Sequence, residues 1–307
     1  MHKPVLYQEV INLLQPRSGQ KFVDCTVGAG GHARGILSAS SPDGLLLGMD
    51  VDPEAITLAR ENLREFEGRF FLVWASYITL IEQLKRFSWA SVDGILLDLG
   101  VSSLQLDNPE KGFSFRTDAP LDMRFDPSNS VTAADLINQL NEDELAEILV
   151  RYGEERYAHQ IAQAIVRSKP VTTTGQLAEI VSKSIGHKKS AIHPATRTFQ
   201  AIRIAVNREL EVIEEVLPLT IQALAPKGRV AVISFHSLED RLVKDFFRRE
   251  SKDCICPPKQ PVCTCGHQAS LRLITKKPVS PGLDEIQVNP RSRSARLRVA
   301  EKIVASG

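Results

Sequence analysis

A short apolar run that meets an acidic residue and then a cluster of glycines constrains the fold of this chain more than any other segment. Residues 22–32 read Phe-Val-Asp-Cys-Thr-Val-Gly-Ala-Gly-Gly-His, and a helix-compatible stretch over 33–39 follows. This order predicts a strand, a tight turn and a helix, with backbone exposed where glycine lets a ligand approach closely. A second apolar run, 45–49, ends in Asp50. An acid at a second strand tip can accept hydrogen bonds from both hydroxyls of a ribose, which predicts a site for an adenosine-bearing molecule.

Two cofactors are compatible with this turn. Gly28, Gly30 and Ala33 satisfy the relaxed dinucleotide fingerprint, so the turn alone leaves a nicotinamide-dependent dehydrogenase open. S-adenosylmethionine would use the turn differently, because it has no pyrophosphate but carries an amino-acid tail. Asp24, directly before the glycines, suits the ammonium group of that tail. The structural alternative is that Asp24 caps the turn and Asp50 caps the next helix.

The first hundred residues alternate between strand and helix patterns. After the two strands above, we expect helices over 53–65 and 77–87 and strands over 69–73 and 92–97. That order predicts an α/β fold with a parallel, doubly wound sheet and right-handed crossovers. Ligands of such sheets bind at the C-terminal ends of the strands. Four polar residues fall at or near those ends: Asp24, Asp50, Tyr77 and Asp98.

The alternation stops after the fourth strand. Residues 104–126 are rich in Asp, Pro, Gly, Phe and Arg without clear periodicity, so they read as a long ordered loop. Four helices are expected next, over 142–151, 154–167, 174–185 and 194–208. We interpret residues 107–206 as an inserted helical domain for substrate recognition, and residues 1–106 with 207–307 as a discontinuous core.

The strand-and-helix pattern returns after residue 207. We expect a helix over 209–224 that bends or breaks at Pro218, a strand over 229–235 and a helix over 237–249. Two late alternating runs, 270–275 and 295–300, predict an antiparallel pair at the end of the sheet. Parallel strands closed by such a pair are typical of the common Rossmann-like methyltransferase fold, whereas a plain dehydrogenase need not end that way.

Charge and hydropathy restrict the partners. No apolar run approaches the ~20 residues needed to cross a bilayer, and the N-terminal residues resemble neither a signal peptide nor a transit peptide. We therefore expect a cytoplasmic protein without a membrane partner. The net charge of +1 conceals two basic segments, because 181–208 contain no acid and 289–302 contain five Lys or Arg residues against one Glu. Beside a nucleotide-type fold, this pair of segments favours nucleic-acid binding over solvated surface.

Four of the five cysteines lie in one short Pro-rich hairpin: Cys254, Cys256, Cys263 and Cys265. In a reducing compartment such a cluster favours a metal over disulfides. One residue between paired cysteines is fewer than zinc sites usually have. A structural zinc is therefore one hypothesis for the hairpin, and a hairpin without metal is the other. The fifth cysteine, Cys25, is expected to be buried in the first strand.

Six blocks of sequence, in conserved order from one end of the chain to the other, resemble the MraW family of ribosomal RNA methyltransferases. They cover residues 24–32, 93–103, 112–116, 121–124, 234–241 and 289–298. Members of this family methylate the exocyclic N4 of a cytidine in the decoding centre of small-subunit ribosomal RNA, using S-adenosylmethionine. The resemblance implies the same reaction here. It leaves open whether the substrate is naked ribosomal RNA or the assembled small ribosomal subunit.

The resemblance also implies which residues contact the cofactor: Gly30, Gly31, His32, Asp50, Tyr77, Asp98 and Gln105. Tyr77 stands where many members carry phenylalanine, and either ring can lie beside adenine. Asp98 is also the catalytic candidate, because an acceptor near N4 would draw its lone pair out of conjugation. Many amino-methyltransferases carry an Asp/Asn-Pro-Pro-aromatic motif at this position, whereas residues 98–101 here are Asp-Leu-Gly-Val. The identity of the proton acceptor therefore stays open.

Residues for binding RNA come from the long loop and from the basic segments. A cytosine in structured RNA must be unstacked to react, and aromatic or arginine planes can then hold it. The loop supplies Phe113, Phe115, Arg116 and Arg124, and the basic segments supply Lys188, Lys189, Arg291 and Arg293. Both phenylalanines could equally be core anchors of the loop. His236 could be a ligand contact or a capping residue.

Two other functions stay open on the sequence. A small-molecule enzyme, either a methyltransferase or an NAD-dependent dehydrogenase, would explain the glycine turn but not the basic segments. A non-catalytic ribosome assembly factor that keeps a cofactor pocket would explain both features without chemistry.

Overall fold

The chain forms two compact units in a computed structural model that describes residues 4–186, 193–258, 260 and 262–304. The first unit comprises Met1–Gly100 and Leu210–Gly307, and the second comprises Val101–Glu209. Within the described residues, no helix is both long enough and apolar enough to cross a membrane.

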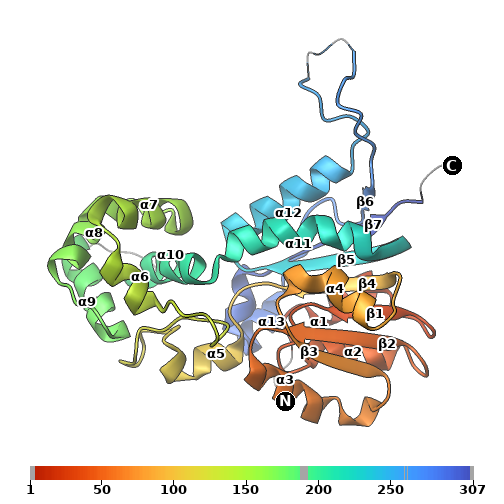
Figure 1. Cartoon of the computed structure of the whole chain (residues 1–307), viewed down its shortest axis with the longest axis horizontal. Helices are drawn as coiled ribbons and strands as arrows, with labels where there is room; N and C mark the ends of the chain where they lie inside the picture. The colour runs from red at the N-terminus through yellow and green to blue at the C-terminus, as the bar shows by residue number, and fades with distance from the viewer. Residues whose placement is uncertain (1–3, 187–192, 259, 261, 305–307) are drawn as a thin grey trace. The chain divides into compact units, whose positions relative to one another are not determined.

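A seven-stranded sheet forms the centre of the first unit (Figure 1). Its strands are β1 (Lys21–Asp24), β2 (Leu45–Asp50), β3 (Phe70–Trp74), β4 (Val92–Asp98), β5 (Leu224–Ser234), β6 (Leu271–Leu273) and β7 (Arg296–Lys302). Their order across the sheet is β3-β2-β1-β4-β5-β7-β6. Strands β1 to β5 are parallel, while β7 runs antiparallel to both β5 and β6. The predicted antiparallel pair is confirmed, and its second strand lies between β5 and β6.

Helices cover both faces of this sheet (Figure 1). They are α1 (Tyr7–Leu14), α2 (Gly31–Ala39), α3 (Pro53–Asn62), α4 (Leu80–Arg86), α11 (Glu209–Ala223), α12 (Ser237–Glu250) and α13 (Leu283–Val288), with short 3₁₀ turns η1 (Arg64–Phe66), η2 (Tyr77–Thr79) and η4 (Pro290–Ser294). Alternate strand residues point to opposite faces. Phe22 and Leu96 therefore pack in the cluster that includes α1, α2 and α3. Val23 and Ile95 pack in the cluster that includes α4, α11 and α12. Burial on both faces explains why these strands read as continuous apolar runs.

Two expectations for this unit need correction, and one helix was not expected. Helix α11 continues through Pro218 without ending there. Strand β5 begins at Leu224, earlier than its apolar run suggested, because the preceding residues pair with β4 beyond an irregularity at its start. Helix α13 has no counterpart among the predicted elements, since its six residues are too few to show a helical period.

The second unit is helical. Its elements are α5 (Ser103–Asp107), η3 (Pro109–Lys111), α6 (Ala133–Gln139), α7 (Glu142–Gly153), α8 (Ala158–Arg167), α9 (Thr174–Ile185) and α10 (Ala195–Asn207). The helix starts predicted at Asn141 and Thr173 are confirmed, because each side chain accepts a hydrogen bond in a capping box. Buried side chains on α7 to α10 form the interior: Leu149, Ile161, Leu177 and Ile202. Two short helices were not predicted, α5 within the expected loop and α6 after it.

Candidate cofactor and catalytic site

Three carboxylates lie at one edge of the sheet in the first unit. Asp24, Asp50 and Asp98 are the last residues of β1, β2 and β4. Between β1 and β4 the strand order reverses direction, which is where open α/β sheets bind their ligands. The sequence predicted this placement, because the ends of parallel strands meet at one edge.

The glycine turn after β1 has a backbone that only glycine adopts easily. Gly28 and Gly30 have φ angles of 51° and 82°, and Gly30 is the N-cap residue of α2. A Cβ atom on Gly30 would lie 3.2 Å from Cγ of Leu63, so the position is crowded as well. The amide of Asn62 donates a hydrogen bond to the Ala29 carbonyl (2.9 Å). This contact from α3 therefore holds the backbone of the turn in one conformation.

Asp50 ties this turn to the tip of β2. Its carboxylate accepts hydrogen bonds from the backbone N–H of Gly28 and of Asp52, each at 2.9 Å. Burial raises the pKa of Asp50 to about 6. A carboxylate has about four acceptor positions, so the remaining ones can accept ribose hydroxyls.

Changing Asp50→Ala is expected to weaken S-adenosylmethionine binding by ~1.5–3 kcal/mol, the range for hydrogen bonds to charged groups. Isothermal titration calorimetry gives the affinity, and a thermal melt reports the loss of the two backbone contacts. Asp52→Asn is the matched control, because Asp52 caps α3 by accepting from the Glu54 N–H (3.0 Å) and asparagine can do the same. Equal affinities for Asp50→Ala and the unmodified protein would remove Asp50 from the site.

Asp24 is a buried carboxylic acid, 1 % exposed. One oxygen accepts a hydrogen bond from the Thr26 N–H (3.2 Å), while Oδ2 has no hydrogen-bond partner among the described residues. Burial raises its pKa to about 7, although His32 opposes that increase. A buried acid with an unpaired oxygen and a pKa near neutrality is typical of a functional site.

Asp98 and His32 complete the polar edge. The backbone N–H of Asp98 donates to Oγ1 of Thr26 (2.7 Å), which locks the tip of β4 to the turn after β1. Nε2 of His32 lies 3.6 Å from Oδ2 of Asp98. Oδ1 of Asp98 and both ring nitrogens of His32 are buried without a hydrogen-bond partner among the described residues. Because buried polar atoms are normally paired, these atoms indicate that a polar ligand completes the site.

The charge of this edge fits S-adenosylmethionine better than a dinucleotide. Asp24, Asp50 and Asp98 present carboxyl oxygens at one edge, which suits the ammonium and sulfonium groups of S-adenosylmethionine and disfavours a pyrophosphate. Pro4 also covers the first turn of α2, since a Cβ atom on Gly31 would lie only 2.5 Å from Cγ of Pro4. A pyrophosphate would need that helix N-terminus.

The other predicted cofactor contacts divide between the two units. Tyr77 begins η2 just beyond β3, where it is half-buried against the apolar cluster of the sheet. Gln105 belongs to the second unit, in α5. Its side chain is buried and accepts a hydrogen bond from the Ser102 N–H (3.0 Å) in a capping box. A cofactor role for either residue stays a prediction.

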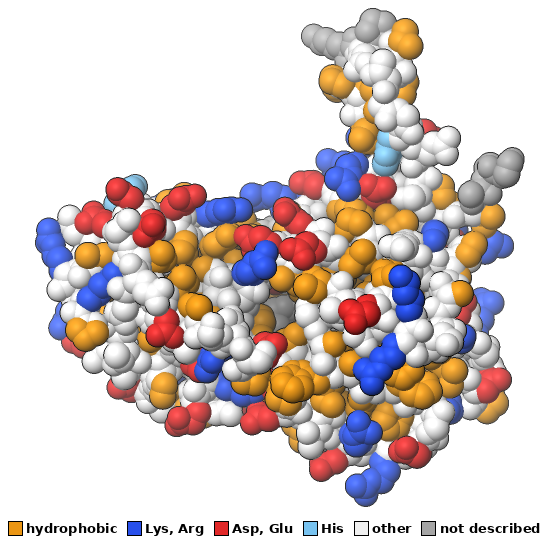
Figure 2. Space-filling view, viewed as in Figure 1, with side chains coloured by type: hydrophobic (Ala, Val, Ile, Leu, Met, Phe, Trp, Pro, Cys, Tyr) orange, Lys and Arg blue, Asp and Glu red, His pale blue; other side chains and the backbone are white. Residues whose placement is uncertain are grey.

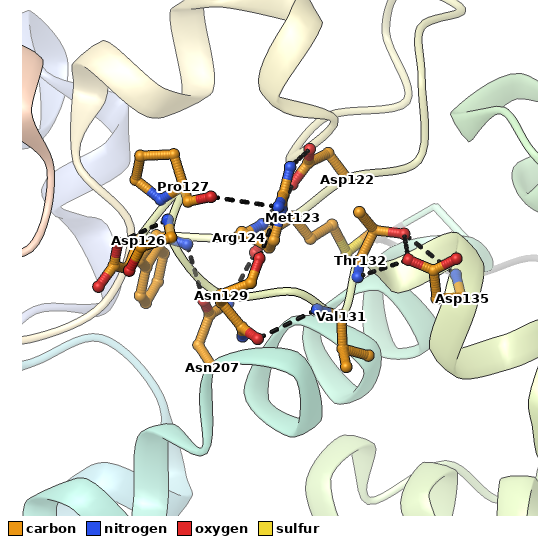
Figure 3. A network of polar contacts seen from close by, with 12 residues as sticks. Asp122, Met123, Arg124, Asp126, Pro127, Asn129, Val131, Thr132, Asp135 and Asn207 are labelled. Carbon is orange, nitrogen blue, oxygen red and sulfur yellow. Dashed lines mark hydrogen bonds and ion pairs between the residues drawn. The ribbon is translucent and has the colours of Figure 1, made fainter.

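Arg124 holds its own loop together (Figure 3). Its guanidinium pairs with both oxygens of Asp122, at 2.8 and 2.7 Å, and also donates to the carbonyls of Pro127 and Asn129. Asn207 joins the same loop to the end of α10 by hydrogen bonds to the backbone of Met123 and Phe125, each at 2.7 Å. Most of the guanidinium donors of Arg124 are thus used within the loop, and a role for this residue in holding a base stays a prediction.

The aromatic candidates also have structural contacts. Phe113 is buried and stacks on Phe125, with ring centroids 5.4 Å apart, which agrees with a core anchor. Phe115 is half-buried between His193 and Phe199. Its neighbour Arg116 is exposed.

The two basic segments are only partly available to a polyanion. Arg298 is buried and forms a bidentate pair with Asp240 (2.7 and 3.0 Å), and Arg296 contacts the same carboxylate. In the second unit, Arg203 pairs with the buried Glu209. Arg298 and Arg203 are therefore turned inward by their ion pairs, whereas Arg296 stays exposed. A docking role for the rest of the two segments stays a prediction. Arg291 and Arg293 are exposed in η4, while Lys188 and Lys189 lie outside the described residues.

Sequence reasoning missed a buried carboxylate near the end of β5. Glu239 is 0 % exposed and accepts hydrogen bonds from the backbone N–H of Phe235 (2.8 Å) and His236 (3.3 Å). His236 is the N-cap of α12, which is one of the two roles expected for it. At Gly100, with φ 84°, an added Cβ atom would be in ordinary contact with this segment, 3.6 Å from Cδ2 of Phe235 and 3.7 Å from Oε1 of Glu239. The spacing His-x-x-Glu after a buried strand was the available signal.

The parallel sheet closed by the antiparallel β7, with its edge of carboxylates beside a glycine turn, defines the class of S-adenosylmethionine-dependent methyltransferases. Within that class, this chain belongs to the MraW methylase family, whose model matches residues 1–303. Relatives named ribosomal RNA small subunit methyltransferase H support this. The relative from Thermomicrobium roseum is 50% identical over 309 residues, covering 100% of this chain and 95% of its own length. The relative from Geobacter sulfurreducens is 52% identical over 307 residues, covering 98% and 99%.

Proposed function

We propose that this protein transfers the methyl group of S-adenosylmethionine to the exocyclic N4 of a cytidine in the decoding centre of small-subunit ribosomal RNA. The observation that carries the chemistry is the buried polar edge of Asp24, His32 and Asp98, whose unpartnered carboxyl oxygens suit a cationic ligand. Membership of the MraW methylase family and the names of the relatives support the RNA substrate. The choice of N4 rests on the family resemblance.

Each carboxylate has a separate task in this proposal. When bound, the cofactor supplies a methyl group on a positively charged sulfur. Asp24 pairs with its ammonium group through Oδ2, and Asp50 accepts from its ribose hydroxyls. Holding donor and acceptor in line contributes ~7–11 kcal/mol to lowering the barrier, so positioning is the main contribution of the protein.

Asp98 acts on the nucleophile. Oδ1, which lacks a partner, accepts one N4–H of the cytosine and so localises the nitrogen lone pair for attack. After methyl transfer, N4 carries a positive charge and loses a proton toward the same carboxylate. The bond from Asp98 N–H to Thr26 keeps the carboxylate at the strand tip throughout.

The helical unit, Val101–Glu209, contributes to substrate recognition in this proposal. Its exposed Arg116 follows Phe115, so a guanidinium and a ring are adjacent on one loop. Unpaired bases are held by such planes in many RNA-binding proteins. The substrate itself is ribosomal RNA, either naked or within the assembled small subunit.

Methyl transfer from tritiated S-adenosylmethionine to small subunits from a strain lacking this enzyme tests the proposal. Nucleoside analysis should then show labelled N4-methylcytidine from one position. Naked ribosomal RNA assayed in parallel separates the two forms of substrate. Cofactor binding without transfer to either form would favour an assembly factor, and transfer only to small molecules would overturn the RNA substrate.

Neutralising Arg291 and Arg293 together, as Arg→Gln, is expected to weaken RNA binding. The negative slope of log K against log salt should become shallower by about one unit per lost phosphate contact. Cofactor affinity should not change. The matched control is Lys85→Gln with Arg86→Gln, which removes the same charge from exposed positions on α4. Filter binding at several salt concentrations measures the slope. An unaltered slope would assign the η4 arginines to ordinary solvated surface.

A further inference from the structure

The hairpin between α12 and β6 extends away from the sheet (Figure 1). We define the cysteine hairpin as residues 251–270. Its described residues form no helix or strand, and its larger apolar side chains are exposed, Ile255 by 44 % and Val262 by 71 %. Charged side chains gather at the base of the hairpin in Figure 2. Neither burial nor regular hydrogen bonding therefore explains its conformation.

The four cysteines of the hairpin nevertheless converge. Their sulfur atoms all lie within 4.8 Å of one another, although the two pairs are separated by six residues of sequence. Sγ of Cys265 lies 3.6 Å from Sγ of Cys263 and 3.9 Å from Sγ of Cys254. A disulfide would bring two of these atoms to ~2.05 Å. The four sulfurs therefore form one cluster and not two bonded pairs.

These separations match a tetrahedral metal site. Zinc–sulfur bonds of ~2.3 Å place the corners of a tetrahedron ~3.8 Å apart. We propose that Cys254, Cys256, Cys263 and Cys265 bind one structural Zn²⁺ as a tetrathiolate site. The single residue between paired cysteines is short for zinc, but this fold of the hairpin still brings all four sulfurs together. Binding would displace the thiol protons to solvent without a redox step.

The surroundings favour four sulfur ligands over three sulfurs and a histidine. Nε2 of His267, the nearest histidine in sequence, lies 3.1 Å from the backbone carbonyl of Arg249 and so is engaged there. The backbone N–H of Ile255 points at Sγ of Cys265 (3.5 Å), a contact that stabilises a metal-bound thiolate. A bound metal would take the place of an apolar core and would stabilise the conformation of the hairpin.

Metal analysis of the full chain tests this proposal. Protein produced with added Zn²⁺ and dialysed against metal-free buffer should contain one zinc per chain by mass spectrometry of the elements. Cys263→Ser with Cys265→Ser should reduce this at least tenfold, while Thr264→Ala, between the two cysteines, should retain it. Replacement with Co²⁺ should produce the absorption bands of a tetrahedral thiolate complex, and these should be absent from the double variant.

Thiol titration separates the alternatives. A zinc site protects the four hairpin thiols from the thiol reagent in the native protein, and a chelator exposes them. In the unfolded protein with chelator, all five cysteines should react. A zinc content below a tenth of an equivalent with reactive native thiols would overturn the proposal, as would two disulfides or stoichiometric iron. A circular dichroism spectrum shared by both variants shows that the sheet is folded, so that zinc loss reports on the hairpin.

Discussion

Asp98→Asn is expected to lower the single-turnover rate of methyl transfer by ~100-fold or more, a typical size for losing a positioned proton acceptor. The dissociation constant of S-adenosylmethionine should change much less. Asparagine keeps the shape of the side chain but lacks the negative charge, whose attraction to N4 grows as N4 becomes positive. An interaction made mainly in the transition state affects the chemical step more than ground-state binding.

Rapid-quench assays at saturating cofactor give the rate, and calorimetry on the same preparation gives the affinity. Asp93→Asn is the matched control, because Asp93 lies near the opposite end of β4 and accepts from the Lys21 N–H (2.9 Å). Its rate should stay near that of the unmodified protein. If Asp98 serves only the cofactor, the affinity of Asp98→Asn will fall and its rate will recover at saturation.

Asp24→Asn should have the second large effect, with opposite signs for binding and for stability. Loss of the charged partner of the cofactor ammonium is expected to weaken binding by ~1.5–3 kcal/mol. Because the pKa of Asp24 is about 7, affinity of the unmodified protein should rise as the pH increases from 6 to 8. That rise should be smaller in the variant, which has no acid at this position.

The cofactor-free variant should be more stable than the unmodified protein at pH 8. Folding raises the pKa of Asp24 from 3.8 to about 7, so the unfolded chain ionises first. Between those values, rising pH favours the unfolded state, and above pH 7 the cost is constant. The full shift would correspond to ~4 kcal/mol, an upper limit. In thermal melts, the difference in Tm between Asp24→Asn and the unmodified protein should widen from pH 5 to pH 7. A difference that does not depend on pH would contradict the burial of this charge.

The placement of the carboxylates was predictable because it depends only on the order of strands and helices along the chain. Once strands and helices alternate, parallel pairing brings the ends of β1, β2 and β4 to one edge, and with them Asp24, Asp50 and Asp98. The turn after β1 was predictable from its glycines alone. These features are local in sequence, so a pattern shows them.

Partners distant in sequence were not predictable. Arg298 looked like part of a basic tail, but β7 lies next to β5 and brings it to Asp240, 58 residues away. Arg124 looked available to RNA, but its loop folds around it. The burial that raises the pKa of Asp24 likewise depends on the packing of the whole edge. Side-chain pairing over such separations leaves no periodic signal.

The place of β7 has a consequence for how the chain folds as it is synthesised. Strands β1 to β4 are adjacent in the sheet and lie within the first hundred residues, so the carboxylate edge can assemble early. Strand β6 sits at the far edge and pairs with β7, which is made last. The C-terminal side of the sheet therefore closes only when Arg296–Lys302 has left the ribosome. Until then the edge of β5 that β7 covers is open, and its unpaired backbone groups can pair with another chain.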